Sequence, residues 1–210
     1  MELLLATRSI HKVREIREIL SATSGLTVLD LEEIGLKWHD EEEALEPFHT
    51  FEENAHSKAE YFHAKTGLPT VADDSGLEVD ALGGAPGVRS KRFAPVEGLS
   101  GDMLDQANND YLVEQLGSLE LEKRTAQYVC VAVVLGLTDQ MIVGRGQAKG
   151  LILAEPCGNG GFGYDPYFFE PNLEMTFAEL HPDQKNELSH RGKAFRTLGG
   201  SLRRWRFRHV

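Results

Sequence analysis

The first 72 residues alternate between short apolar runs and helical patterns, and this order limits the fold more than any other feature. Apolar runs with the length of buried strands occupy residues 2–6, 27–31 and 68–72. Between these runs, apolar residues recur at helical spacing from Ile10 to Leu20 and again from Phe51 to Phe62. A succession of strand, helix, strand, helix and strand is typical of an α/β layered fold.

Local signals mark the ends of these helices and predict the rest of the chain. Ser9 or Thr7 suits the N-cap of the first helix, the second begins near Thr50, and Gly67 suits its C-terminal stop. Further helices are predicted at 102–116 and from near Ser189 toward Leu202. Strands are predicted at 126–137 and 141–153, joined as a hairpin, with loops at 39–49 and 156–172. We expect one domain over residues 1–210, in which the hairpin region could form a second lobe beside a cleft.

Composition excludes several classes of protein. The formal net charge of −11 disfavours duplex nucleic acid as a partner, although a local group of lysines and arginines can still bind a small anion. No apolar run approaches the roughly 20 residues of a membrane span, and the first residues lack the pattern of a signal peptide. The two cysteines, Cys130 and Cys157, lie far apart without metal-like spacing. We therefore expect a reduced, cytoplasmic protein with no nucleic-acid or membrane partner.

Two adjacent acidic residues, Asp73 and Asp74, follow the apolar run 68–72 directly. This order predicts that they lie where a buried strand opens into a loop. One interpretation is that an aspartate caps a turn through Ser75 and Gly76. The other is that a carboxylate binds Mg²⁺ or activates water, because Mg²⁺ needs only one or two carboxylates beside substrate phosphates. Another carboxylate could come from the acidic region, at Glu46 or Glu53.

Polar and basic residues surround the predicted start of the first helix, at Thr7, Arg8, Ser9 and Lys12. Free backbone N–H groups and the helix dipole favour an anion at such a position. A capped surface helix without a ligand explains the same residues equally simply. The Walker pattern is absent from the chain, so any phosphate here binds to a different type of loop.

Glycines at 158, 160 and 163 spell G-x-G-x-x-G, but no helix is predicted after them, because Tyr164-Asp165-Pro166 follows. The segment is therefore not a dinucleotide fingerprint. Phe162 or Tyr164 could stack on a flat ring, and Asp165 could accept a hydrogen bond from it. Packing in an aromatic core is the alternative.

Three basic residues lie near the predicted start of the last helix: Lys185, His190 and Arg191. Cations at a helix N-terminus oppose the dipole, and an anion or a polar ligand would explain them. A solvated helix face is the alternative. The arginine-rich end of the chain favours a solvated or dimer-facing helix over an RNA-binding one.

Five segments, taken in order, resemble the inosine triphosphate pyrophosphatase family, whose members hydrolyse noncanonical purine nucleoside triphosphates. They are LLATRSIHKVREIREIL, TFEENAHSKAEY, GLPTVADDSGLEVDALGGAPGVRSKRFA, GGFGYDPYFFEP and KNELSHRGKA. The resemblance implies an α/β fold with an elongated mixed sheet flanked by helices, two lobes, a central cleft and a homodimer. It also implies Mg²⁺-dependent hydrolysis of inosine, deoxyinosine or xanthosine triphosphate to the monophosphate and pyrophosphate.

The resemblance also implies roles for individual residues. Asp74 would be the catalytic base and a metal ligand, Glu46 a second metal ligand, and Ser75 a substrate contact. The phosphates would be bound by Thr7, Arg8, Ser9, Ile10, His11 and Lys12, with Lys58 assisting. The base would be held by Phe162, Gly163, Tyr164, Asp165, Lys185, His190 and Arg191.

The chain departs from the family pattern at two places. Arg8 and Ser9 stand where the family has Gly-Asn; Ser9 can still donate a hydrogen bond, and Arg8 either strengthens phosphate binding or points to solvent. Glu46 lies in Leu45-Glu46-Pro47-Phe48, where the family has Glu-Glu-Thr-Gly. Two other functions remain open from the sequence: a nucleotide-binding regulator without catalysis, which the retained Asp73-Asp74-Ser75 disfavours, and a general nucleotide phosphatase.

Overall fold

The computed structural model describes residues 1–209 and divides into two compact units. Unit 1 comprises residues 1–74, 130–146 and the C-terminal segment from His190 onward, and unit 2 comprises residues 75–129 and 147–189. The predicted α/β class with a mixed sheet is confirmed, because the strands follow the order β2-β1-β3-β4-β5-β6-β7. β1 pairs in parallel with β2 and β3, whereas β6 pairs antiparallel with β5 and β7. The predicted cleft stays a prediction.

Unit 1 contains the elements predicted from the alternating first 72 residues. Its strands are β1 (Glu2–Leu5), β2 (Thr27–Asp30) and the first half of β3 (Thr70–Val79). Its helices are α1 (Ile10–Leu20), α2 (Phe51–Thr66) and α5 (His190–His209). Parts of β4 (Thr125–Leu135) and β5 (Ile142–Ile152) complete it. A short 3₁₀ helix, η1 (Asp40–Ala44), lies in the acidic segment, so the prediction of a plain loop there was wrong.

The predicted caps at Ser9 and Gly67 are confirmed, and the second helix begins near Thr50 as predicted. Ser9 is the N-cap of α1, and its side chain accepts a hydrogen bond from the backbone N–H of Lys12. Thr50 caps α2 in the same way through the N–H of Glu53. Gly67 ends α2 at φ 68°, a left-handed conformation that costs a residue with a side chain about 1–2 kcal/mol.

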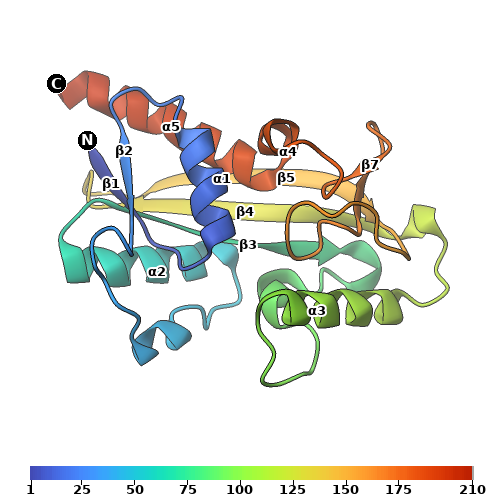
Figure 1. Ribbon diagram of the computed structural model, residues 1–210. Coiled ribbons are helices and arrows are strands. Elements are labelled where there is room, and N and C mark those ends of the chain that lie inside the picture. Colours follow the sequence, from blue (N-terminus) through green and yellow to red (C-terminus); the bar gives the residue numbers. More distant parts are fainter. Residues whose placement is uncertain (210) are drawn as a thin grey trace. The chain divides into compact units, whose positions relative to one another are not determined.

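The core of unit 1 depends on the alternation of side chains along its strands. Leu3, Leu5 and Val71 share one hydrophobic cluster with apolar residues of α1 and α5. Leu4 and Ala72 are also fully buried, and the strand period places them on the opposite face. Figure 1 shows α2 on that face of the strands and α5 on the other. The sheet of unit 1 is therefore covered by helices on both sides.

Glycines let α5 lie directly on β5. A Cβ at Gly144 would be 2.4 Å from the carbonyl oxygen of Ala194, and one at Gly146 would be 2.1 Å from that of His190. The obstructing atoms are backbone, so the helix would have to move away from the strand. This close approach fixes where the first turn of α5, with His190 and Arg191, lies in unit 1.

Unit 2 consists of the remaining parts of β3, β4 and β5, two helices and several short elements. The helices are α3 (Gly101–Leu116) and α4 (Pro182–Leu188), the short strands are β6 (Phe168–Glu170) and β7 (Met175–Thr176), and the 3₁₀ turns are η2 (Asp80–Leu82), η3 (Gly87–Arg92) and η4 (Leu121–Lys123). Tyr128, Phe168 and Phe177 form the aromatic centre of its core, with ring centroids 4.6–5.9 Å apart.

Three predictions for this half of the chain can be compared with the structure. β4 and β5 are neighbours in the sheet, as the predicted hairpin requires. The predicted loop 156–172 contains the strand β6. This strand has only three residues, so it is too short for an alternating sequence pattern to reveal it. The last helix begins at His190 as expected but continues past Leu202 to His209.

Within residues 1–209, no helix has both the length and the apolar character needed to span a bilayer.

We expect Gly146→Ala to lower the free energy of unfolding by about 3 kcal/mol, the upper part of the range for overpacking, because its Cβ would meet backbone of α5. Gly67→Ala is the matched control: no atom lies within 4 Å of its Cβ, so only the left-handed backbone conformation is penalised, by about 1 kcal/mol. Urea unfolding of both variants measures the difference. Equal losses would contradict the close packing of β5 against α5.

Candidate active site

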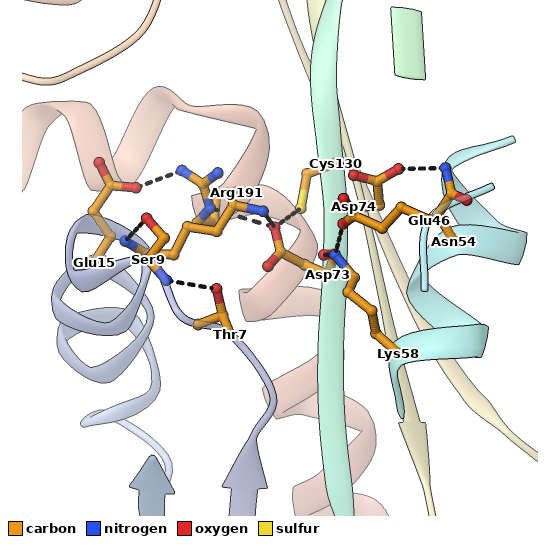
Figure 2. A network of polar contacts seen from close by, with 11 residues as sticks. Thr7, Ser9, Glu15, Glu46, Asn54, Lys58, Asp73, Asp74, Cys130 and Arg191 are labelled. Atoms are coloured by element: carbon orange, nitrogen blue, oxygen red, sulfur yellow. Dashed lines mark hydrogen bonds and ion pairs between the residues drawn. The ribbon is translucent and has the colours of Figure 1, made fainter. Parts of the chain in front are cut away.

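Asp73 and Asp74 lie in the middle of β3, and the prediction that they stand where the strand opens into a loop was wrong. β3 continues from Thr70 to Val79, with Leu77 and Val79 buried beyond the acidic pair. Successive side chains of a strand point to opposite faces, so the two carboxylates are separated by the sheet itself. Asp73 faces α1 and α5, and Asp74 faces α2 (Figure 2). This separation explains how adjacent acidic residues can occupy a buried strand.

The carboxylate of Asp73 is an anchor for basic residues. It is 1% exposed, and its Oδ2 lies 3.0 Å from Nζ of Lys12 and 3.6 Å from Nε of Arg191. The thiol of Cys130 also donates to this oxygen, over 3.8 Å. Burial alone would raise the pKa of Asp73, but Lys12, Arg191 and Lys58 outweigh it and hold the pKa well below its usual range. Asp73 is therefore a permanent anion that fixes α1 and α5 to the strand.

Arg191 is held between two carboxylates. Its NH1 donates to Glu15 of α1 over 2.6 Å, and its Nε faces Asp73 (Figure 2). Burial would lower the pKa of Arg191, but Glu15 and Asp73 outweigh it and raise that pKa. His190, which precedes it, is also buried. The structure thus groups these two predicted base contacts with Lys12 and Asp73 in unit 1.

The carboxylate of Asp74 has different surroundings. It is 7% exposed and accepts a hydrogen bond of 3.0 Å from Nδ2 of Asn54. Burial raises the pKa of Asp74, and Glu46 adds to the rise, against the opposing effects of Lys58 and Lys12. A buried carboxylate whose pKa is moved toward neutrality is suited to accept a proton.

Lys58 and Asn54 surround Asp74 from the same face of α2, one turn apart. Lys58 donates to the carboxylate of Glu46 and, over 2.6 Å, to the backbone carbonyl of Asp73. Its pKa is raised, because Glu46, Asp74 and Asp73 together outweigh the lowering effect of burial. Asn54 exchanges two hydrogen bonds with the backbone of Phe48, of 2.9 and 3.3 Å. It therefore ties the segment that carries Glu46 to the side chain of Asp74.

Asn54 was missed by the sequence reasoning. It is 1% exposed and joins three groups, yet only its position predicts this: a polar residue between the apolar Phe51 and Ala55, one helical turn before Lys58. A polar residue on the buried face of an amphipathic helix is the signal that could have found it. Glu53, the alternative metal ligand, is instead exposed and paired with Thr50.

The residues at the start of α1 divide into two groups. Ser9 and Thr7 are hydrogen-bonded to each other through the Ser9 N–H, over 3.2 Å, and Lys12 reaches Asp73. Arg8 instead pairs with Glu42 and donates to the carbonyls of Leu36 and Lys37. Its guanidinium thus binds the segment that leads to the acidic residues, and the contact of Arg8 with phosphate stays a prediction.

The start of α1 also borders open space. A hollow of about 580 Å³ is lined by Thr7, Arg8 and Ile10, together with the basic Arg14 and Arg17 and the acidic residues that face them. Ile10 is 82% exposed and His11 is exposed as well. Backbone N–H groups of the first turn of α1 have no partner inside the helix, so this end of α1 can receive an anion.

A second cluster, in unit 2, contains the other predicted base contacts. Asp165 is 3% exposed and accepts hydrogen bonds from Nζ of Lys185 over 2.7 Å and from the N–H of Phe162 over 2.8 Å. Nζ of Lys185 also lies 4.9 Å from the centroid of the Phe162 ring. Tyr164 is a core residue whose hydroxyl donates to the carbonyl of Ser90, whereas Phe162 is only half-buried. Phe162 is therefore the aromatic side chain that a ligand can reach.

The donor set around Asp74 fits a magnesium ion only in part. Among residues 1–209, no group of three or more histidine, cysteine, aspartate or glutamate side chains is arranged to hold a metal. Asp74 and Glu46 nevertheless offer hard carboxylate oxygens, and Glu46 helps to raise the pKa of Asp74, so a cation between them would be stabilised. Mg²⁺ retains several waters and takes further ligands from phosphates, so two carboxylates suffice.

We expect Asp73→Asn and Asp74→Asn to differ in stability although they are adjacent and isosteric. Asp73→Asn leaves buried cations without their anion and should lower the free energy of unfolding by roughly 3–5 kcal/mol at pH 7. Asp74→Asn removes a charge that burial disfavours and keeps an oxygen for Asn54, so the change should stay within about 1 kcal/mol. Urea titrations measure both.

The same variants have a pH signature. The pKa of Asp73 is lowered on folding, so its charge stabilises the fold above the ordinary aspartate pKa, and this stabilisation is lost as the pH falls below about 3.9. The difference in the free energy of unfolding between wild type and Asp73→Asn should therefore become smaller in acid. A difference in the free energy of unfolding that stays constant from pH 7 to pH 3 would contradict the ion-paired role of Asp73.

Comparisons with known proteins show the family of the chain. The model of the Ham1 family matches residues 3–200. A dITP/XTP pyrophosphatase from Thioalkalivibrio sulfidiphilus is 45% identical to this protein, and the match covers 94% of this chain and 96% of the relative. A dITP/XTP pyrophosphatase from Thermus thermophilus is also 45% identical, and that match covers 94% of this chain and 90% of the relative. A solved HAM1 protein from Coxiella burnetii superposes with a TM-score of 0.81 at 34% identity, covering 96% of this chain and 98% of that chain. The resemblance inferred from the five segments is confirmed, and the chain belongs to the Ham1 family.

Proposed function

We propose that this protein hydrolyses inosine, deoxyinosine and xanthosine triphosphates to the monophosphate and pyrophosphate, with Mg²⁺ as cofactor. The broader activity, that of a nucleoside triphosphate pyrophosphatase, follows from membership of the family and from curated relatives that carry this name. The observation that carries the proposal is the environment of Asp74: a buried carboxylate with a raised pKa, beside Glu46 and Lys58, on the opposite face of β3 from the ion-paired Asp73.

The chemistry requires a proton acceptor and charge neutralisation. A water molecule attacks the α-phosphorus, the bond to the bridging oxygen breaks, and pyrophosphate departs with the electron pair. Asp74 orients that water and accepts its proton, which the raised pKa favours. Lys12 and the N-terminus of α1 neutralise charge on the phosphates. A bound Mg²⁺, held by Asp74 and Glu46, would supply further neutralisation of phosphate charge.

Lys12 can bind phosphate oxygens while it remains paired with Asp73. Its side chain is 17% exposed, whereas that of Asp73 is fully buried, so part of the Lys12 side chain remains open to solvent. An ammonium group has three donors, and one bond to Asp73 leaves two for phosphate oxygens. Asp73 thus holds Lys12 in position for a ligand at the start of α1.

Selection of the base is assigned to unit 2. The 6-oxo group of hypoxanthine and xanthine accepts hydrogen bonds, whereas adenine has an amino donor at this position. Lys185 is a donor whose position is fixed by Asp165 and by the ring of Phe162, so it would favour an oxo group and repel an amino group. Phe162 offers a face for stacking on the purine.

We expect inosine triphosphate and Mg²⁺ to yield pyrophosphate and inosine monophosphate, and Asp74→Asn to reduce kcat by a factor of about 10²–10⁴ or more, because the water loses its proton acceptor. Glu53→Gln is the matched control: it removes an exposed carboxylate of the same acidic region and should leave kcat unchanged. Product analysis by ion chromatography decides the reaction. Release of orthophosphate alone would indicate a general phosphatase, and normal turnover in Asp74→Asn would remove Asp74 from its role.

We also expect kcat/KM for inosine triphosphate to exceed that for adenosine triphosphate by roughly a hundredfold, since the ammonium group of Lys185 would meet an amino donor of adenine instead of an oxo acceptor. Steady-state kinetics with the two nucleotides measure this ratio under the same Mg²⁺ concentration. Equal values would show that Lys185 and Asp165 do not select the base.

A further inference from the structure

The segment that carries Phe162 and Asp165 is held on its outer side by α3. The N–H of Gly163 donates to Oδ2 of Asp105 over 2.8 Å, and the carbonyl of Gly163 accepts from Nδ2 of Asn109 over 3.0 Å. Asp105 and Asn109 are four residues apart on one helix and therefore lie on the same face of α3. Together they bind both polar groups of a single residue.

Gly163 requires such fixation. Its φ is +62°, and an added Cβ would meet nothing within 4 Å, so space does not explain the conformation. Glycine occupies left- and right-handed conformations about equally in an unconstrained chain. The hydrogen bonds from α3 select one of them, and this choice decides the direction of Phe162 on one side and of Tyr164 on the other.

We call the two hydrogen bonds from Asp105 and Asn109 to Gly163 the clamp. Asp165 adds further hydrogen bonds on the other side of Gly163. Asp165 accepts from the N–H of Phe162, and its other oxygen accepts from the hydroxyl of Tyr128 over 3.4 Å. The N–H of Phe162 and both polar groups of Gly163 therefore all have side-chain partners. The ring of Phe162 is thereby held beside the ammonium group of Lys185.

Asn109 is costly to the fold. It is 4% exposed, and no group among residues 1–209 donates to its Oδ1. A buried acceptor without a partner disfavours the folded state, so the favourable polar contact of this side chain is the hydrogen bond from its Nδ2 to Gly163. Asp105 is half-buried, and its charge adds to the effect of burial in raising the pKa of Tyr164.

We propose that Asp105 and Asn109 are positioning residues for base selection: through Gly163 they fix Phe162 and the Asp165–Lys185 pair in the geometry that recognises a 6-oxopurine nucleotide. This inference rests on the proposed function. It assigns a role to two residues of α3 that belong to none of the five segments of the family resemblance.

The kinetic test compares inosine and adenosine triphosphates in Asp105→Ala and Asn109→Leu. Loss of a charge-assisted hydrogen bond should raise KM for inosine triphosphate by roughly tenfold and reduce its advantage over adenosine triphosphate by a similar factor, with kcat changed by less than about threefold. Asp105→Asn keeps an acceptor for the Gly163 N–H and should recover most of the selectivity. Unchanged KM and selectivity in both variants of an active enzyme would overturn the proposal.

Asn108→Ala is the matched control. Asn108 is the same residue type, lies next in sequence, and is 2% exposed, but it binds the backbone of Lys91, Phe93 and Ala94 instead of Gly163. Its removal should lower Tm while leaving the preference for inosine triphosphate intact. If Asn108→Ala lost selectivity as strongly as Asp105→Ala, general weakening of α3 would explain the effect and the clamp would be rejected.

Hydrogen exchange separates this inference from the proposed function. Amide exchange in a peptide covering residues 157–168 should accelerate at least tenfold, roughly, in Asp105→Ala, because the Gly163 N–H loses its acceptor, while peptides from unit 1 stay unchanged. Unchanged exchange would overturn the clamp whatever the substrate is. A wild-type protein that releases no pyrophosphate from inosine triphosphate would instead overturn the proposed function, and exchange alone would then decide on the clamp.

Discussion

The alternation of side chains along β3 is the constraint on which the rest of the site depends. Two carboxylates that follow each other in a helix or a loop would compete for the same cations, but in a strand they face opposite sides. Asp73 is thereby committed to Lys12 and Arg191, and Asp74 is left beside Asn54 and Glu46. One aspartate stabilises the fold and the other is held at the expense of stability. Both roles arise from a single step along the chain.

The architecture of unit 1 could be read from the sequence because local signals agreed with one another. Strand runs, helical spacing and caps at Ser9 and Gly67 all predicted the same elements, and the structure contains them. The end of β3 could not be read, since glycine and charge suggested a loop, whereas partners from three helices satisfy the charge inside the strand. Tertiary contacts overrode the local preference there.

The candidate site shows the same division. Asp74, Lys12 and Lys185 were identified from the residue pattern and Lys58 by the resemblance. The first two lie on opposite faces of β3 in unit 1, with Lys58 near Asp74, and Lys185 lies in unit 2. Asn54, Asp105 and Asn109 were not identified, because each acts through backbone or through another side chain. Asn54 lies within the segment TFEENAHSKAEY but was given no role, and Asp105 and Asn109 lie outside all five segments. Arg8 could not be placed either, since its partners, Glu42 and two carbonyls, lie 28 or more residues away in the chain. Supporting residues of this kind are visible only when the chain is folded.

The burial of Arg191 between Glu15 and Asp73 has a consequence for how this protein can change over generations. Neutralising one of these three side chains leaves an opposite charge buried without its full set of partners. Single substitutions here are therefore destabilising even where a double substitution would be tolerated. Divergence at these three positions must therefore proceed in concert, through rare compensated steps. Substitutions at exposed positions meet no such barrier, so Glu15, Asp73 and Arg191 should persist together while exposed residues around them are replaced.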